Sequence, residues 1–125
     1  MLKQLSIYAE NKKGALQTMT NALYEAGINI WGSVTNDGAE YGINRMVVSD
    51  PDKAKEVLTE RGYLCRFVDV LAVEIEDKPG ALNTLLTALL DSNVNVDYTY
   101  LSFNRDSSTP VMILHTADPE EVEIC

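Results

Sequence analysis

The sequence predicts an α+β protein built from two tandem ferredoxin-like (βαββαβ) units, the second of which lacks its last strand. Two observations support this fold class. The chain repeats itself at an offset of 66 residues, and each copy alternates strand-like with helix-like segments in the same order. We place the first domain at residues 1–68 and the second, C-terminally truncated, domain at residues 69–125. With 46% hydrophobic residues in 125, the chain can form a globular core.

Glycine and polar residues match in the repeat as well as apolar ones. A shift of 66 residues places Gly14–Leu16 on Gly80–Leu82, which is the sequence GAL in both copies. The same shift pairs Lys12 with Lys78, Thr18 with Thr84, Asn29 with Asn95 and Met46 with Met112. Matches of glycine, lysine and asparagine in one register are rarer by chance than apolar matches, so the pattern indicates a duplication.

The first copy contains all six segments of one βαββαβ unit. The strand Leu2–Glu10 comes first and is followed by a helix with the inner residues Leu16, Met19, Leu23 and Ala26. The strands Asn29–Thr35 and Tyr41–Ser49 then flank the turn Asn36-Asp37-Gly38. A helix from Asp50-Pro51 to Gly62 and the strand Tyr63–Val68 complete the unit. Alternation of apolar and polar residues marks the strands, and a three-to-four-residue spacing marks the helices. Asp50 is an expected N-terminal cap of the second helix.

The second copy repeats this order but ends early. Its segments are the strand 70–76, the helix 81–92 and the strands 94–103 and 110–116. Seven residues follow Asp118, whereas eighteen follow the matching Asp50 up to Val68. A last helix can therefore begin at Asp118-Pro119, but the final strand cannot form. The apolar edge of the first strand would then be uncovered, so we expect a partner chain or another segment to fill it, unless the unit is simply incomplete.

Charge and composition exclude several function classes. The net charge is −9, and residues 69–125 carry all of it, with two basic and eleven acidic residues. Such a surface repels a phosphate backbone, so we expect no nucleic-acid partner. No apolar run approaches the length of a membrane span, and the N-terminus lacks a signal-peptide layout, so a cytoplasmic protein is expected. Cys65 and Cys125 do not have a metal-ligand spacing, and no cofactor is expected.

The two GAL turns are the candidate functional motif. Each leads from a strand end into a helix start, where free backbone N–H groups and the helix dipole can bind a carboxylate. Asn11 and Asp77 precede the glycines, and Asn29 and Asn95 follow the helices. Their side-chain oxygens can accept hydrogen bonds from an ammonium group. The pattern suits a free amino acid, although a glycine turn and a helix-capping asparagine also occur for purely structural reasons.

The stretches DKPGAL…NVNV and NKKGAL…GINI resemble ACT domains, which are small amino-acid-binding regulatory modules with a ferredoxin-like fold. YGINRMVVSDPDKA further resembles small stand-alone proteins with two tandem ACT domains, and the resemblance covers nearly the whole chain. It implies a free amino acid as the small-molecule ligand, a binding site shared between two domains, and a homodimer or higher oligomer. Two departures are Asp77, a charge in place of an amide, and Lys13, which replaces the usual proline.

The resemblance to the serine-sensing ACT domain of phosphoglycerate dehydrogenase assigns ligand contacts to the turn and to the residues after the helix. The expected ligand-binding residues are Asn11, Gly14, Ala15, Leu16, Asn29, Ile30, Asp77, Gly80, Ala81, Leu82, Asn95 and Val96.

The expected function is therefore a non-catalytic amino-acid-binding sensor. One alternative is a detached regulatory subunit that controls a metabolic enzyme by protein–protein contact. Another is an enzyme of the acylphosphatase type, which would need an arginine in the turn, where this chain has Lys12-Lys13 and Lys78-Pro79. His115 has no neighbouring nucleophile pattern and is expected to be an ordinary strand residue.

Overall fold

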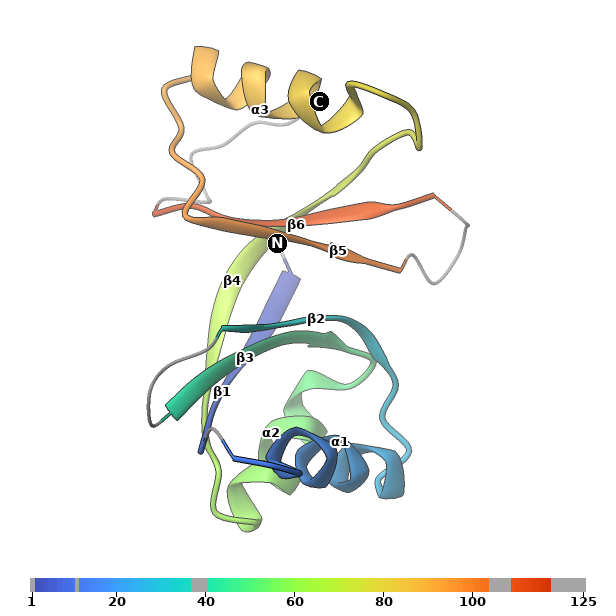
Figure 1. The fold of residues 1–125 in the computed structure, drawn as a ribbon, viewed down its shortest axis with the longest axis vertical. Coiled ribbons are helices and arrows are strands. Elements are labelled where there is room, and N and C mark those ends of the chain that lie inside the picture. The colour runs from blue at the N-terminus through green and yellow to red at the C-terminus, as the bar shows by residue number, and fades with distance from the viewer. Residues whose placement is uncertain (1, 11, 37–40, 104–108, 118–125) are drawn as a thin grey trace. The chain divides into compact units, whose positions relative to one another are not determined.

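The computed structural model describes residues 2–10, 12–36, 41–103 and 109–117 (Figure 1). The described elements are β1 (Leu2–Glu10), α1 (Ala15–Glu25), β2 (Ile30–Asn36), β3 (Tyr41–Val48), α2 (Pro51–Glu60), β4 (Leu64–Glu74), α3 (Ala81–Asp91), β5 (Tyr98–Ser102) and β6 (Val111–His115). They fall into two compact units, one of Lys3–Val68 and one of Asp69–Cys125 together with Met1–Leu2.

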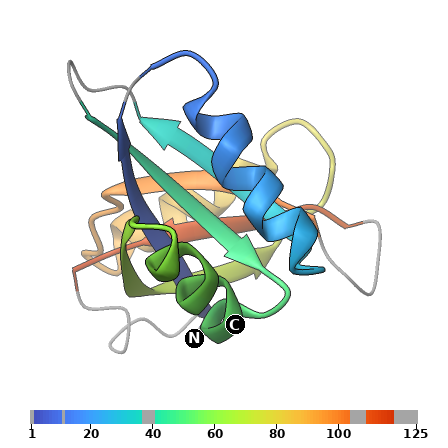
Figure 2. The same ribbon diagram turned by 90° about the horizontal axis from the view of Figure 1, so that it is seen from below.

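In the first unit, an antiparallel sheet is covered by two helices. β3 pairs with β1 on one edge, where Leu5 is opposite Met46, and with β2 on the other, where Thr35 is opposite Asn44. Figure 2 shows α1 in blue and α2 in green over the same face of these strands. The core lies between them and comprises Leu5, Ile7, Met19, Ala22, Leu23, Ile28, Met46, Val48, Ala54, Leu58 and Cys65.

Helix starts and ends follow the local sequence. Asp50 caps α2 as expected, since its Oδ1 accepts a hydrogen bond from the Lys53 N–H at 3.2 Å. The three described helices end with the same pair of features: a residue at positive φ, and a backbone bond that reaches back five residues. The left-handed residues are Gly27, Gly62 and Asn93, and the bonds are Ile28 N–H to Leu23 O, Tyr63 N–H to Leu58 O and Val94 N–H to Leu89 O.

In the second unit, β6 is the central strand. It pairs antiparallel with β4, where Leu71 is opposite Leu114, and with β5, where Leu101 is opposite Met112. α3 lies over one face of β5 and β6 (Figure 1). Leu89 is its buried residue. The last helix expected at Asp118-Pro119 lies outside the described residues.

The registers correct one detail of the repeat. Leu5 and Leu71 are equivalent, yet the first faces Met46 and the second faces Leu114. The structural counterpart of Met46 is therefore Leu114, and the predicted match of Met46 with Met112 is wrong. The two additional residues of the second copy lie before β6, in the connection after β5. A sequence match cannot locate an insertion inside a hairpin, because only the strand pairing fixes the register.

The expected strands Tyr63–Val68 and 70–76 form one strand, β4. The boundary between the two compact units falls inside it, between Val68 and Asp69. No glycine or proline interrupts residues 63–76, so nothing in the local sequence ends the strand.

Candidate functional site

The first GAL turn leaves the start of α1 without a side-chain cap. Gly14 has φ 85°, a left-handed conformation that glycine adopts at little cost. The Ala15 N–H donates to the Lys12 carbonyl at 3.2 Å, and the first intrahelical bond joins the Thr18 N–H to the Gly14 carbonyl at 3.0 Å. No side chain among the described residues caps this helix. Its remaining first-turn N–H groups can therefore bind an anion.

The second turn has the same geometry. Gly80 has φ 86° and caps α3 without a side-chain hydrogen bond. The Ala81 N–H donates to the Lys78 carbonyl at 3.3 Å, and the Thr84 N–H donates to the Gly80 carbonyl at 2.9 Å. The threonine hydroxyls of both copies also match, since Thr18 and Thr84 donate to the glycine carbonyls at 2.9 and 3.0 Å.

The lysine of each turn forms an ion pair with the glutamate at the end of the preceding strand. Lys12 Nζ lies 3.2 Å from Glu10 Oε2, and Lys78 Nζ lies 2.8 Å from Glu76 Oε2. All four side chains are exposed, so these pairs contribute little to stability. In both copies the lysine ammonium therefore lies beside the glutamate that ends the preceding strand segment.

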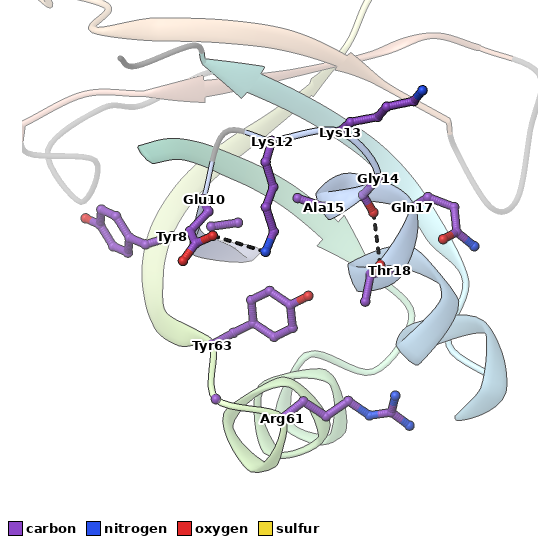
Figure 3. Close-up of a pocket in the computed structure, with 12 residues that line it drawn as sticks. Tyr8, Glu10, Lys12, Lys13, Gly14, Ala15, Gln17, Thr18, Arg61 and Tyr63 are labelled. Carbon is purple, nitrogen blue, oxygen red and sulfur yellow. Dashed lines mark hydrogen bonds and ion pairs between the residues drawn. The ribbon is translucent and has the colours of Figure 1, made fainter. Parts of the chain in front are cut away.

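A cavity of about 480 Å³ adjoins the first turn (Figure 3). It extends from the end of β1 and the first turn of α1 to the connection between α2 and β4, and is lined by Tyr8, Ala9, Glu10, Lys12, Lys13, Gly14, Ala15, Gln17, Thr18, Arg61, Gly62 and Tyr63. In Figure 3 Lys12 reaches back to Glu10, whereas Lys13 extends away from that pair. Arg61 is paired with Glu25 at 3.2 Å. Cations thus outnumber acids around this cavity, which favours an anionic group.

A smaller cavity of about 230 Å³ adjoins the same turn. Its lining is Ala9, Glu10, Lys12, Ala15, Leu16, Met19, Thr35, Asn36, Gly42 and Asn44. Four of these residues, from Ala9 to Ala15, also line the larger cavity. The turn therefore borders two spaces, one that leads to the α2–β4 connection and one that leads to β2 and β3.

Asn29 and Ile30 lie at the other end of α1 from Gly14. The helix has 11 residues, which makes it about 16 Å long. The Asn29 N–H donates to Ser49 Oγ and its carbonyl accepts from the Ser49 N–H, both at 2.9 Å. Asn29 lines neither of the two cavities. Within one unit, the structure does not bring the turn and this asparagine together.

The second-copy residues belong to a polar network that the sequence did not indicate. Asn95 Nδ2 donates to Asp97 Oδ1 at 3.1 Å, and Asp97 Oδ2 lies 2.9 Å from His115 Nδ1. The His115 ring stacks on Tyr98, with 4.8 Å between ring centroids. His115 is a strand residue, as expected. The network depends on the register of β5 against β6, which the local sequence does not determine.

The other predicted site residues are placed as follows. Asp77 is exposed in the bend that precedes α3. Gly80 caps this helix, and Ala81 and Leu82 are its first two residues. Val96 is half-buried and precedes β5. Asn11 lies outside the described residues.

The structure offers little else for metal or thiol chemistry in the part of the chain it describes. No three His, Cys, Asp or Glu side chains there come together as metal ligands. Burial raises the pKa of the Cys65 thiol, and this effect outweighs a hydrogen bond from Thr59 and the charge of Lys55, which both lower the pKa. The thiol is therefore protonated at neutral pH. None of the described helices combines the length and the apolar character that a membrane span requires.

A comparison with sequence-family models and a comparison with solved structures both give matches over nearly the whole chain. The sequence model described as an ACT domain pair matches residues 1–124. A crystal structure of a Bacteroides thetaiotaomicron protein is 32% identical, with a TM-score of 0.87, and the match covers 96% of this chain and 82% of that one. A comparison with curated protein sequences gives no match.

Two more distant structures share the fold alone. The regulatory subunit of aspartate kinase from Thermus thermophilus has a TM-score of 0.69 at 14% identity, with 94% of this chain and 85% of that chain covered. The corresponding subunit from Thermus flavus has a TM-score of 0.62 at 18% identity, with 96% and 88% covered.

Proposed function

Because the chain belongs to the ACT domain family and contains a pair of such domains, we propose that it is a non-catalytic regulatory protein that binds a free amino acid. One observation supports this most strongly. The uncapped start of α1 borders a cavity of about 480 Å³, which falls within the size range of small-molecule sites.

The ligand carboxylate would accept hydrogen bonds from the N–H groups of Leu16 and Gln17, which precede the first intrahelical bond of α1. The partial positive charge of the helix start and the surrounding cations favour the same group. The ligand ammonium would face the carboxylate of Glu10, which lines both cavities. Gly14 keeps this approach open, since it has no side chain at the point where the ligand meets the backbone.

The second turn would bind in the same way through Gly80, Ala81 and Leu82. Asp77 beside it adds a negative charge, which favours the ligand ammonium. Asn29 and Asn95 would contribute only from another domain, because each follows the far end of its helix. We therefore include in the proposal a homodimer in which a second copy of the chain completes the site. Its two units would be ferredoxin-like, and the second would lack the last strand.

A detached regulatory subunit is the second candidate. The fold is shared with regulatory subunits of aspartate kinase, and in this version the chain would control a metabolic enzyme by protein–protein contact. Co-purification of an enzyme whose activity responds to an amino acid would support this version. An acyl-phosphate hydrolysis assay tests the enzymatic alternative, and we expect no activity.

Titration calorimetry with each of the twenty amino acids tests the proposal. We expect at least one to bind at or below millimolar concentration. The Gly14→Ala variant should weaken that binding, and Asn29→Ala and Asn95→Ala report on the residues from another domain. If no amino acid binds at millimolar concentration, the proposed function is wrong.

A further inference from the structure

Asn44 is a buried amide beside the hydrophobic core of the first unit. Its exposed fraction is 2%, and it lies on β3 two residues before Met46, which belongs to the core. Residues two apart on a strand point to the same face of the sheet, so Asn44 faces the helices. Burying an amide there costs free energy unless its polar atoms find partners.

A cross-strand network satisfies the amide only in part. Asn44 Nδ2 donates to Thr35 Oγ1 at 2.7 Å and to Ser33 Oγ at 3.0 Å, which uses both of its hydrogens. Asn44 Oδ1 has a single contact at 3.4 Å, from the Ser33 hydroxyl, which is long for an O–H···O bond. The carbonyl oxygen therefore keeps acceptor capacity. Thr35 accepts through its oxygen and keeps its own O–H to donate.

This unused donor and acceptor lie at one cavity. Asn44 and Thr35 both line the 230 Å³ space beside the GAL turn, and the rest of its wall includes the apolar residues Leu16 and Met19. Pockets for whole small molecules range from about 300 to 1,000 Å³. The smaller cavity suits one side chain, whereas the larger cavity beside the same turn suits the remainder of a ligand.

The second copy shows that the fold does not need these polar residues. The strand registers make Leu101 the counterpart of Thr35 and Met112 the counterpart of Asn44, and these two face each other in β5 and β6. Met112 is buried at 4% exposure. An apolar pair thus fits the position that Thr35 and Asn44 occupy in the first copy, so the polar pair is not required for packing.

We propose that Asn44 and Thr35 form a specificity subsite for the ligand side chain, which selects an amino acid whose side chain ends in a group that both donates and accepts hydrogen bonds, namely a carboxamide or a hydroxyl. This inference rests on the proposed function. The Asn44 carbonyl accepts from the ligand group, and the Thr35 hydroxyl donates to it. A methyl group of equal size would leave both unpaired.

Calorimetry with pairs of similar shape tests this inference. L-asparagine is compared with L-leucine, and L-threonine with L-valine. We expect the polar member of at least one pair to bind the wild-type protein tenfold or more tightly than the apolar member. Asn44→Met introduces the residue of the second copy, and Thr35→Val removes only the hydroxyl of an exposed residue. Both should reduce the ratio to about one.

The control is Ser6→Ala, which removes a buried hydroxyl from β1 that accepts from Gln4 Nε2 and lines neither cavity. It should leave the ratio unchanged. If Asn44→Met does not fold, the affinity ratio measured with Thr35→Val alone tests the subsite. A wild-type ratio near one, or an unchanged ratio in the folded variants, overturns the subsite while amino-acid binding stands. Absence of binding by every amino acid overturns both proposals.

Discussion

The two copies share their GAL turns and differ in what covers the helix that follows. The glycine φ angles differ by one degree, 85° against 86°, and the turn hydrogen bonds match. In the first copy α1 packs against α2, and Met19 and Ala22 are each 1% exposed. Their counterparts on α3 are Leu85, which is half-buried, and Ala88, which is exposed. Turn geometry therefore depends on a few neighbouring residues, whereas burial depends on the next element in the fold.

The largest expected effect is on the helix core. Met19→Ala should cost about 3 kcal/mol of unfolding free energy, because it leaves a cavity between α1, α2 and the sheet. Leu85→Ala, at the equivalent position of α3, should cost about 1 kcal/mol, since part of that side chain is already in water. Urea denaturation followed by circular dichroism measures both. Equal costs would show that the two helices are covered to the same extent.

Larger side chains at the equivalent alanines of α1 and α3 also test the difference in burial between the two helices. Ala22→Leu should destabilise by about 2 kcal/mol, because the buried methyl group has no room for a larger side chain. Ala88→Leu should change stability by no more than about 0.5 kcal/mol, as expected for an exposed helix position. Thermal unfolding of the two variants provides the comparison, and a strongly destabilised Ala88→Leu would contradict it.

The glycine turns should respond alike. Gly14→Ala and Gly80→Ala should each cost about 1 kcal/mol, because alanine is strained at positive φ. A Cβ at either position meets no atom within 4 Å, so the cost comes from the backbone alone. Clearly unequal costs for the two variants would mean that the turns are not equivalent in solution.

The smallest expected effect concerns the residue before each glycine. Lys13→Pro gives the first turn the residue of the second, Pro79, and should stabilise by about 0.5 kcal/mol by restricting the unfolded chain. Pro79→Lys should have the opposite effect. Urea denaturation measures both, and a destabilised Lys13→Pro would show that the backbone at Lys13 departs from that at Pro79.

The features that the sequence predicted are those that depend on neighbouring residues. The Asp50 cap and the two glycine turns follow from residues within one helix turn. The features that it missed depend on strand pairing. Asn44 meets Thr35 only because β2 and β3 pair in one register, and Asp97 meets His115 only because β5 pairs with β6. Met46 was matched with Met112 instead of Leu114 for the same reason.

The continuity of β4 has a practical consequence for dissecting this protein. Its eleven residues form the last strand of one copy and the first strand of the other, so the boundary between the copies lies inside a continuous strand. A gene split after codon 68 would cut β4 between Val68 and Asp69, and each fragment would keep only part of this strand. Study of either copy alone therefore needs overlapping fragments that both retain the whole of β4.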